Sequence, residues 1–320
     1  MTPRLSRPEN GPVTTPAIET VGLRKAYGRT VALESLDIRV DAGEVFGFLG
    51  PNGAGKTTAV KLLLGLTRPT AGSGTVLGRP LGDLEARRRI GYLPELFRYQ
   101  AWLTAREVLG LHARLAGLDA ARRRSEVERV LALVGLDGRG DDRMGGFSKG
   151  MQQRLGLGAA LLGDPSLVIL DEPTSALDPV GRDDVRAIIR EAQARGSAVL
   201  LNSHLLGEVE RLCDRVAIVN HGTVVAAGPL TALLGQAAVR IRVTGLPPDR
   251  SPLDAFGDHE DDEEGWLVVR GLDEDRIPDL VAAIVAAGGR VHAVDPGRRS
   301  LEDLFLDLVR APETAPESAA

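Results

Sequence analysis

The sequence predicts an α/β fold in which helices cover a mostly parallel β-sheet, followed by a small α+β domain. Three apolar runs, Glu44–Gly50, Ser166–Pro173 and Ser197–His204, are typical of buried strands, because a strand covered on both faces is apolar throughout. Amphipathic segments such as Asp183–Arg195 separate the runs. This alternation is typical of parallel strands connected by helices.

Composition excludes several classes of protein. The chain has 320 residues, of which 43% are hydrophobic and 26% are charged, values of an ordinary soluble globular protein rather than of a collagen, a coiled-coil rod or a disordered chain. Its net charge of −5 provides no general basic field, so we expect no nucleic-acid partner. The single cysteine, Cys213, is expected to be a small buried apolar residue, as in a reducing compartment.

The chain is expected to form two domains between two tails. The tails lack apolar periodicity and are expected to be disordered. The longest stretch without charge, Val216–Val239, is interrupted by polar residues and glycines, so it predicts a short strand and a turn rather than a membrane span. The N-terminus has no apolar leader segment. The expected parts are a tail at 1–16, a main domain at 17–236 with a helical subdomain at about 82–163, a small α+β domain at 237–310 and a tail at 311–320.

The small domain has its own pattern of strands and helices. Its acidic run predicts a solvated loop rather than a metal cage, because the carboxylates are contiguous instead of spaced around a turn glycine. The apolar face of its last helix (Leu301, Leu304, Phe305, Leu308) is expected to join the core, with a regulatory or dimer contact as the second interpretation. In order, we expect a strand at Val239–Thr244, an acidic loop at Asp258–Glu264, a strand at Trp266–Arg270, and then a helix at Arg276–Ala287, a strand at Arg290–Val294 and a helix at Leu301–Arg310.

A phosphate-binding loop follows the first apolar run. The segment GPNGAGKTT, Gly50–Thr58, meets the pattern G-x-x-x-x-G-K-[ST], and a helix-forming run follows it. Its glycines let backbone N–H groups converge on phosphate oxygens at a helix N-terminus. We expect Lys56 to reach the β and γ phosphates and the Thr57 hydroxyl to face Mg²⁺. The expected nucleotide contacts are Gly50, Pro51, Asn52, Gly53, Ala54, Gly55, Lys56, Thr57 and Thr58.

Two adjacent acids end the second apolar run. Asp171 and Glu172 close the segment LVILDEP, and a buried strand that ends in two acids needs a cation nearby. We expect Asp171 to hold Mg²⁺ through water and Glu172 to act as the general base that polarises water for attack on the γ phosphate. A helix N-cap before Pro173 is the alternative interpretation.

These features together resemble the ATP-binding subunits of ABC transporters over roughly Ala17–Leu234. The segment FSKGMQQRL, Phe147–Leu155, lies where that family has its LSGGQ signature. Ser148 and Gly150 match the signature, whereas three positions depart from it (Phe147, Lys149 and Met151). A serine and a glycine that open a helix suit γ-phosphate binding. The resemblance implies that Ser148, Lys149 and Gly150 contact nucleotide.

Other family elements occur in the expected order. Tyr27 lies upstream of the phosphate loop, where the family stacks an aromatic ring on adenine. Glu95, in GYLPELF, replaces the usual glutamine of the Q-loop and can still bind Mg²⁺ through its carboxylate. Ser175–Asp178 matches the D-loop, which crosses a dimer interface, and His204 matches the switch histidine that contacts the γ phosphate. The resemblance therefore implies ATP and Mg²⁺ as cofactors, with Glu172, His204 and Lys56 as catalytic residues.

The resemblance also implies partners. The chain has one phosphate loop and one signature, so we expect it to be half of a dimer, either a homodimer or a heterodimer with a second ATPase subunit, that sandwiches two ATP molecules. The YLPE segment, the SKGM-type signature and the ending SLEDLFLDLVR look like exporter-type subunits that pair with a polytopic ABC-2 permease. Such a subunit is cytoplasmic and peripheral on the inner face of the cell membrane.

The sequence leaves alternatives open for one group of aromatic residues and for the function. Phe97, Tyr99 and Trp102 lie within six residues although only 3% of the chain is aromatic; they indicate either a partner surface or burial against the helical subdomain. A soluble ABC-type ATPase that acts on the ribosome or DNA is the main alternative function, although fused cassettes and heptad insertions are absent. A generic P-loop ATPase or GTPase leaves the signature and His204 unexplained.

Overall fold

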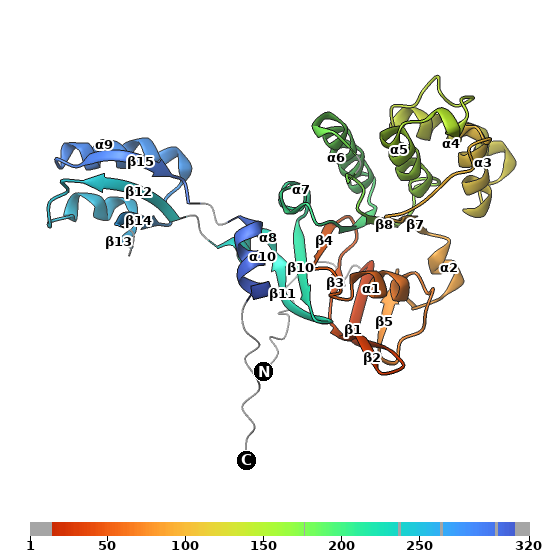
Figure 1. The fold of residues 1–320 in the computed structure, drawn as a ribbon, viewed down its shortest axis with the longest axis horizontal. Helices are drawn as coiled ribbons and strands as arrows, with labels where there is room; N and C mark the ends of the chain where they lie inside the picture. The colour runs from red at the N-terminus through yellow and green to blue at the C-terminus, as the bar shows by residue number, and fades with distance from the viewer. Residues whose placement is uncertain (1–14, 176, 236–237, 263–264, 298–299, 311–320) are drawn as a thin grey trace, which may run out of the picture. The chain divides into compact units, whose positions relative to one another are not determined.

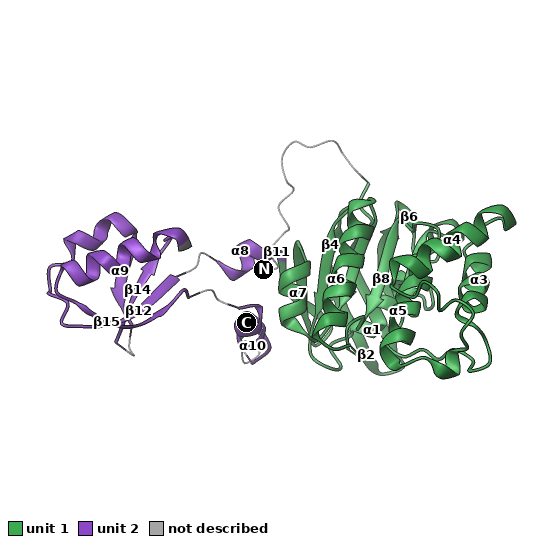
Figure 2. Ribbon diagram, turned by 90° about the horizontal axis from the view of Figure 1, so that it is seen from above, with its two compact units in different colours: residues 1–227 green, residues 228–320 purple. Residues whose placement is uncertain are grey.

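The computed structural model describes most of the chain (Figure 1). It divides into two compact units, 1–227 and 228–320 (Figure 2), and each unit has an apolar cluster of its own. The tails that we expect to be disordered lie outside the described residues, apart from Thr15 and Pro16. Within the described part, no helix combines the length and the apolar character needed to cross a bilayer. The described residues are 15–175, 177–235, 238–262, 265–297 and 300–310.

The first unit contains the predicted α/β architecture. Its strands are β1 (Ile18–Tyr27), β2 (Thr30–Leu36), β3 (Arg39–Val40), β4 (Val45–Leu49), β5 (Ala71–Val76), β6 (Arg79–Pro80), β7 (Ile90–Leu93), β8 (Leu167–Asp171), β9 (Ala198–Asn202), β10 (Arg215–Asn220) and β11 (Thr223–Pro229). Its helices are α1 (Lys56–Leu63), α2 (Leu84–Arg87), α3 (Ala105–Leu115), α4 (Ala120–Leu133), η1 (Met144–Gly146), α5 (Lys149–Ala160), α6 (Pro179–Ala194) and α7 (Leu206–Leu212).

The strands of this unit are ordered so that the predicted site lies at one edge of a parallel sheet. The order is β6-β5-β1-β2-β11-β10-β4-β9-β8-β7, and β3 pairs with β1. The pairs from β10 through β4, β9 and β8 to β7 are parallel, whereas β1 pairs antiparallel with β2 and β5. Because the central strands are parallel, their carboxyl ends meet at one edge. The segments after β4, β7, β8 and β9 therefore start there.

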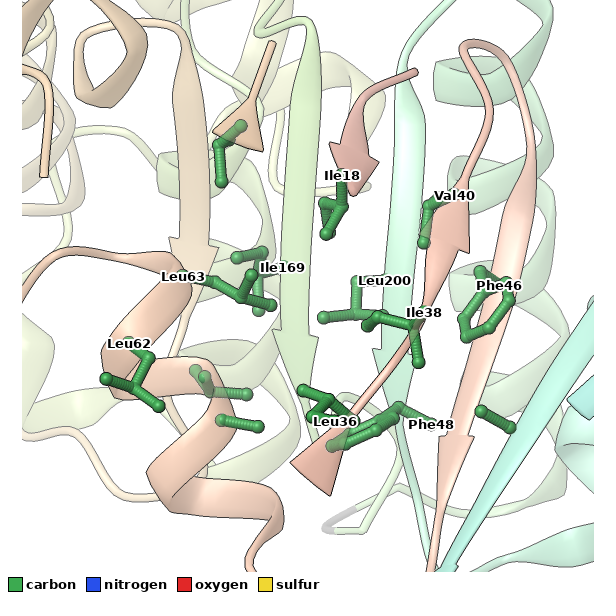
Figure 3. Close-up of a cluster of buried hydrophobic side chains, with 14 of the residues drawn as sticks. Ile18, Leu36, Ile38, Val40, Phe46, Phe48, Leu62, Leu63, Ile169 and Leu200 are labelled. Atoms are coloured by element: carbon green, nitrogen blue, oxygen red, sulfur yellow. The ribbon is translucent and has the colours of Figure 1, made fainter. Parts of the chain in front are cut away.

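The central strands are apolar, except for the last residue of β8 and of β9, because both of their faces are covered. Every residue of β4, β8 and β9 is buried, which explains the uninterrupted apolar runs. Figure 3 shows Phe46 and Phe48 of β4 in one cluster with Leu62 of α1 and Ile169 of β8. Cys213 is also buried, as expected.

The predicted helical subdomain contains a strand of the main sheet. Helices α2 to α5 lie within 82–163, but β7 also lies there and pairs in parallel with β8. The four residues of β7 are too few to give a distinct apolar run. Helix α3 begins at a capping box, in which Thr104 accepts the N–H of Glu107 at 3.2 Å and donates its own N–H to that side chain at 2.8 Å.

The second unit contains a four-stranded antiparallel sheet in the order β13-β14-β12-β15. Its apolar cluster consists of Val239, Ile241, Leu253, Leu267, Val269, Leu272, Leu280 and Ile284. The elements of the unit are α8 (Leu230–Leu234), β12 (Ala238–Thr244), η2 (Ser251–Phe256), β13 (Asp258–Asp261), β14 (Trp266–Arg270), η3 (Glu274–Arg276), α9 (Ile277–Ala286), β15 (Arg290–Asp295) and α10 (Leu301–Arg310).

The expected acidic loop is wrong at its start, because Asp258–Asp261 forms strand β13 and pairs with β14. Arginines pair with two of its three carboxylates. Glu260 pairs with Arg270, and Asp261 accepts two hydrogen bonds from Arg250 at 2.8 and 2.6 Å. These opposite charges remove the repulsion that would disfavour a strand of contiguous acids. No cluster of three or more His, Cys, Asp or Glu side chains among the described residues forms a metal site.

The apolar face of the last helix is buried in part, as expected for core. Leu301 and Leu304 of α10 are buried, whereas Phe305 and Leu308 are half-buried. Helix α10 packs against α8, and the two buried residues lie outside the apolar cluster of the four-stranded sheet. The chain leaves the first unit through α8, forms the sheet, and comes back to α8 with α10 (Figure 1).

Candidate functional site

The phosphate loop connects β4 to α1, and its backbone requires glycine. Gly53 and Gly55 have φ values of 83° and 102°, a region that other residues rarely adopt. A Cβ atom on Gly50 would lie 2.3 Å from the carbonyl oxygen of Val219, and one on Gly55 would lie 2.5 Å from that of Ala32. The loop thus runs against two neighbouring backbone segments. Within the loop, Asn52, Gly53 and Thr57 are exposed, Pro51, Gly55 and Thr58 are half-buried, and Ala54 is buried.

The Lys56 ammonium group lies inside this loop. Its Nζ donates to the carbonyl oxygens of Gly50 at 2.6 Å and Pro51 at 3.2 Å. Burial lowers the pKa of the ammonium group. The charges of Glu172, Asp171 and Glu95 oppose this lowering. The loop therefore presents a cation whose partners are backbone carbonyls, which a phosphate group can replace with stronger acceptors.

Asp171 ends β8 beside Asn202, the last residue of β9. The two residues are register partners, and Nδ2 of Asn202 donates to Oδ1 of Asp171 at 2.5 Å. Burial raises the pKa of the Asp171 carboxyl group, while the hydrogen bond from Asn202 lowers it. The other amide atom, Oδ1 of Asn202, is buried without a hydrogen-bond partner. A buried acceptor in this position can take a hydrogen bond from a water molecule or a ligand.

Glu172 is buried and held by the segment that follows β9. The backbone N–H of His204 donates to Oε1 of Glu172 at 2.8 Å, and Nδ1 of His204 lies 2.8 Å from Oε2. The hydroxyl group of Ser203 donates to Oε2 at 3.4 Å. The side chain of Glu172 is 9% exposed and that of His204 is 65% exposed. The carboxylate is thus fixed on the protein side, and the imidazole remains open to solvent.

Glu95 follows β7 at the same edge of the sheet. Leu93 of β7 pairs with Leu170 of β8, so Glu95 and Glu172 each lie two residues past a paired position. Glu95 is exposed, and its charge contributes to raising the pKa of Asp171. The charges of Glu95 and Glu172 both act on the Asp171 carboxyl group, and all three acids act on Lys56 of the phosphate loop.

The signature segment and the segment after β8 lie side by side. Ser148 caps α5 and accepts the N–H of Met151 at 3.2 Å. A Cβ atom on Gly150 would lie 3.2 Å from Cδ2 of Leu177. Asp178 caps α6 and accepts the N–H of Gly181 at 2.8 Å. Lys149 is exposed, and Ala176 lies outside the described residues.

Tyr27 ends β1 with its ring exposed. The ammonium group of Lys25 lies 4.8 Å from the ring centroid, so one face carries a positive charge. Among the described residues, no hydrogen bond or ion pair joins Tyr27, Ser148 or Lys149 to Lys56 or Glu172. The structure brings the loop, the two acids, Glu95 and His204 together. Tyr27, Ser148 and Lys149 are not part of this group.

Sequence reasoning missed three residues of the site: Asn202, Ser203 and Gln153. Asn202 and Ser203 stand between an apolar strand and His204, and polar residues at that place are a signal that could have indicated them. Gln153 donates its amide Nε2 to the carbonyl oxygens of Glu172 at 3.3 Å and Pro173 at 3.0 Å. It lies in the middle of a helix, where the sequence carries no comparable signal.

Comparison with known proteins assigns the family. Residues 33–175 match the family described as ABC transporter. An uncharacterized ABC transporter ATP-binding protein of Nostoc sp. (strain PCC 7120) is 40% identical over 311 residues, which cover 94% of this chain and 92% of that protein. The chain belongs to the family of ABC transporter ATP-binding proteins. As a member, it is an ATP-binding protein and an ATPase.

Two further relatives extend this result. A Nod factor export ATP-binding protein I of Burkholderia lata is 37% identical over 297 residues, which cover 91% of this chain and 96% of that protein. A solved ATP-binding subunit of an ABC transporter is 34% identical, with a TM-score of 0.63, and covers 68% of this chain and 91% of its own. The α/β fold predicted from the sequence is therefore confirmed as that of an ABC ATPase.

Proposed function

We propose that this ABC ATP-binding protein is the ATP-hydrolysing subunit of an exporter and that it drives a separate membrane permease through ATP-dependent dimerisation. The observation that carries the proposal is the fixed carboxylate of Glu172, held from two sides by His204 at the sheet edge beside the phosphate loop. The name of the relative from Burkholderia lata, a Nod factor export protein that matches nearly the whole chain, supports export as the direction.

Each site residue has its own function in ATP hydrolysis. Lys56 binds the terminal phosphates and takes up negative charge as it develops. Glu172 accepts a proton from the attacking water, and His204 holds both the carboxylate and the γ phosphate in line. The remaining nucleotide contacts that we propose are Tyr27 on the adenine, Gly50 to Thr58 around the phosphates, Glu95 at the Q-loop position, and Ser148, Lys149, Gly150 and Asp178 at the second subunit's nucleotide.

The donor set beside the loop fits Mg²⁺. The Thr57 hydroxyl and the carboxylates of Asp171 and Glu95 are hard oxygen ligands, and Mg²⁺ in nucleotide sites binds one or two carboxylates together with substrate phosphates. The unpartnered Oδ1 of Asn202 next to Asp171 is ready to accept a hydrogen bond from a water of such an ion. When bound, Mg²⁺ neutralises charge on the β and γ phosphates.

Dimerisation is supported by the single phosphate loop and the single signature segment of the chain. In the proposed arrangement, the signature that contains Ser148 acts on nucleotide bound at Lys56 of another subunit. A chain with one copy of each therefore completes a site by facing a second subunit, most simply a second copy in twofold symmetry. A heterodimer with another ATPase subunit satisfies the same geometry. ATP favours the closed pair, and hydrolysis reopens it.

The helical subdomain provides a surface for the permease. Leu96 is 87% exposed and Trp102 is 66% exposed. Phe97 and Tyr99 are half-buried, and their rings pack at a tilt of 55° with centroids 5.3 Å apart. Burial against the helical subdomain thus applies to Phe97 and Tyr99, and a partner surface applies to Trp102. Exposed large apolar side chains are typical of contact sites, and a permease there would hold the chain at the inner face of the membrane.

The division of the chain that we infer from its sequence, 17–236 and 237–310, stays a prediction. It assigns the ATPase site to the first part and leaves regulation or dimer contact as possible functions of the second. The structural boundary between compact units, after residue 227, falls nine residues earlier than the proposed one.

The decisive experiment for dimerisation uses Glu172→Gln. Removing the base stops hydrolysis but keeps the shape of the side chain, so the variant should form a stable dimer with ATP that size-exclusion chromatography resolves. Glu191→Gln is the matched control, because Glu191 pairs with Arg195 on the surface of α6, and it should behave like the parent. A Glu172→Gln variant that stays monomeric at saturating ATP contradicts the sandwich.

A pull-down tests the transporter assignment separately. Tagged parent protein is recovered from detergent-solubilised membranes, and the partners are identified by mass spectrometry. A polytopic membrane protein in near one-to-one ratio is the expected result. Ribosomal proteins or DNA-repair factors in its place would refute the exporter proposal and leave the ATPase site unaffected.

A further inference from the structure

Gln153 is a buried polar residue in the middle of helix α5. It is 5% exposed, and a buried amide without partners is costly. Its Nε2 donates to two carbonyl oxygens far away in sequence, those of Glu172 at 3.3 Å and Pro173 at 3.0 Å. Both amide hydrogens are therefore directed at the peptide groups that follow β8.

The backbone that Gln153 contacts is strained. Glu172 has a φ of 53°, in the left-handed region that residues other than glycine rarely adopt and keep only where their surroundings hold them. Four hydrogen bonds hold this peptide. The N–H of Glu172 donates to Asn202 at 2.8 Å, and its carbonyl oxygen accepts from Gln153, from the hydroxyl group of Ser175 at 3.1 Å and from the N–H of Ser175 at 3.4 Å.

Only one of these partners comes from the helical subdomain. Asn202 ends the neighbouring strand, and Ser175 belongs to the same turn as Glu172. Gln153 lies on α5, five residues after the cap Ser148. A helix moves as a rigid element, so a shift of α5 at Ser148 moves the donor that holds Glu172.

We propose that Gln153 is a positioning residue, whose side-chain amide holds the backbone of Glu172 in its left-handed conformation. The orientation of the catalytic carboxylate then depends on the position of helix α5. The inference rests on the proposed function of Glu172 as the base. It adds a connection between the signature helix, which faces a second subunit's nucleotide, and the base that acts on the chain's own nucleotide.

If Gln153 only filled space in the interior, the volume of its side chain would matter and its amide group would not. Methionine has nearly the volume and flexibility of glutamine and lacks the donor. Glutamate has the shape of glutamine, and in its neutral form its O–H group can donate one hydrogen bond. The two substitutions therefore separate the volume of the side chain from its ability to donate.

The test measures kcat for ATP hydrolysis and, independently, the Kd for ATP by titration with the purified full chain. Gln153→Met should lower kcat about tenfold or more, with a Kd within twofold of the parent, because the amide acts on the base and not on the phosphate loop. The matched control is Gln193→Met. Gln193 donates its amide to the carbonyl oxygen of Gly43 at 3.1 Å and to Asp214 at 2.8 Å, and this variant should keep the parent values.

Gln153→Glu gives a readout that depends on pH. Burial raises the pKa of the introduced carboxyl group, so the donor form increases as pH falls from about 8 to about 6. The ratio of the variant's kcat to the parent's kcat should rise over this range. If Gln153→Met fails to fold, Gln153→Glu provides the test, because a variant kcat equal to the parent's at every pH in this range overturns the proposal.

The other outcomes are also decisive. A kcat of Gln153→Met within twofold of the parent overturns the inference, as does a fall in kcat with an equal rise in Kd. A parent chain that hydrolyses no ATP, with or without its membrane partner, refutes the proposed function instead. The two failures are therefore distinguishable.

Discussion

His204 contacts Glu172 twice, through its backbone N–H to Oε1 at 2.8 Å and through its ring Nδ1 at 2.8 Å from Oε2. Two contacts to two different oxygens fix both the position and the rotation of the carboxylate. The ring is otherwise open to solvent, with 65% of the side chain exposed. The contact to the γ phosphate that we propose for His204 would use this open side of the ring.

Removing the imidazole should affect turnover more than binding. In His204→Ala the backbone N–H contact remains and the ring contact is lost, so the carboxylate can rotate. We expect kcat to fall roughly 10- to 100-fold with little change in the Kd for ATP, measured by steady-state hydrolysis and by titration. His292→Ala is the control, because His292 is exposed and contacts Thr244 in the other unit. Equal losses in both variants would argue against the assignment of His204.

Removing the Lys56 ammonium group should abolish activity. Lys56→Ala deletes the charge that the phosphate loop presents, and we expect hydrolysis to fall at least about a hundredfold with weaker ATP binding. Lys61→Ala removes an exposed charge from the last turn of the same helix and should leave both quantities unchanged. Hydrolysis by Lys56→Ala at the parent rate would show that the nucleotide binds elsewhere.

The ion pair between Glu126 and Arg129 should make stability depend on pH. The hydrogen bond from Arg129 holds the pKa of Glu126 below its ordinary value of 4.5, and the N–H of Gly163 donates to the same carboxylate at 2.7 Å. A carboxyl group with a lowered folded-state pKa stabilises the fold fully above its unfolded-state pKa, and this contribution is lost as pH falls through the folded-state pKa.

Glu126→Gln should therefore lower the free energy of unfolding by about 2 kcal/mol at neutral pH. The difference from the parent should shrink below pH 4.5, where the parent carboxylate becomes protonated. Urea denaturation followed by circular dichroism at several pH values measures it. Glu85→Gln, which breaks an exposed pair with Arg88, should have little effect at any pH. A Glu126→Gln difference that stays constant with pH would rule out the pair as the cause.

Two glycines should respond to alanine in opposite directions. Gly91 lies in β7, and a Cβ atom there would be 1.7 Å from the carbonyl oxygen of Ala160 at the end of α5. Gly91→Ala should destabilise the fold by about 3 kcal/mol. Gly110 lies inside α3, and a Cβ atom there would meet open space, so Gly110→Ala should stabilise the fold by about 1 kcal/mol. Urea denaturation checks both, and a tolerated Gly91→Ala would contradict the close contact of β7 with α5.

The sequence predicted the parts of the fold whose pattern is local. Fully buried strands such as β8 have apolar residues up to their last position, and α6 shows its period clearly, although it begins at Pro179 rather than at Asp183. The antiparallel strands β1, β2 and β5 were not predicted. Strand β1 alternates only partly and contains Gly22 with a φ of 54°, so its strand conformation depends on its partners rather than on its own sequence.

The difference between local patterns and long-range contacts also applies to the site. The phosphate loop and the acids after β8 were found because their chemistry depends on consecutive residues. Asn202 and Gln153 were missed because their function comes from distant contacts, 31 residues to Asp171 in one case and 19 to Glu172 in the other. Tertiary contacts of this kind leave no period or spacing in the sequence.

The entry and the exit of the four-stranded sheet lie side by side, and there the N–H of Ala238 donates to the carbonyl oxygen of Gly297 at 3.3 Å. Gly297 has a φ of 60°, and a Cβ atom there would overlap the carbonyl group of Ala238. The sheet is therefore an insertion whose two ends lie next to each other. It stands between two helices, α8 and α10, that are in contact. Such a module can be lost, exchanged or replaced by a short linker without changing the path of the chain on either side of it.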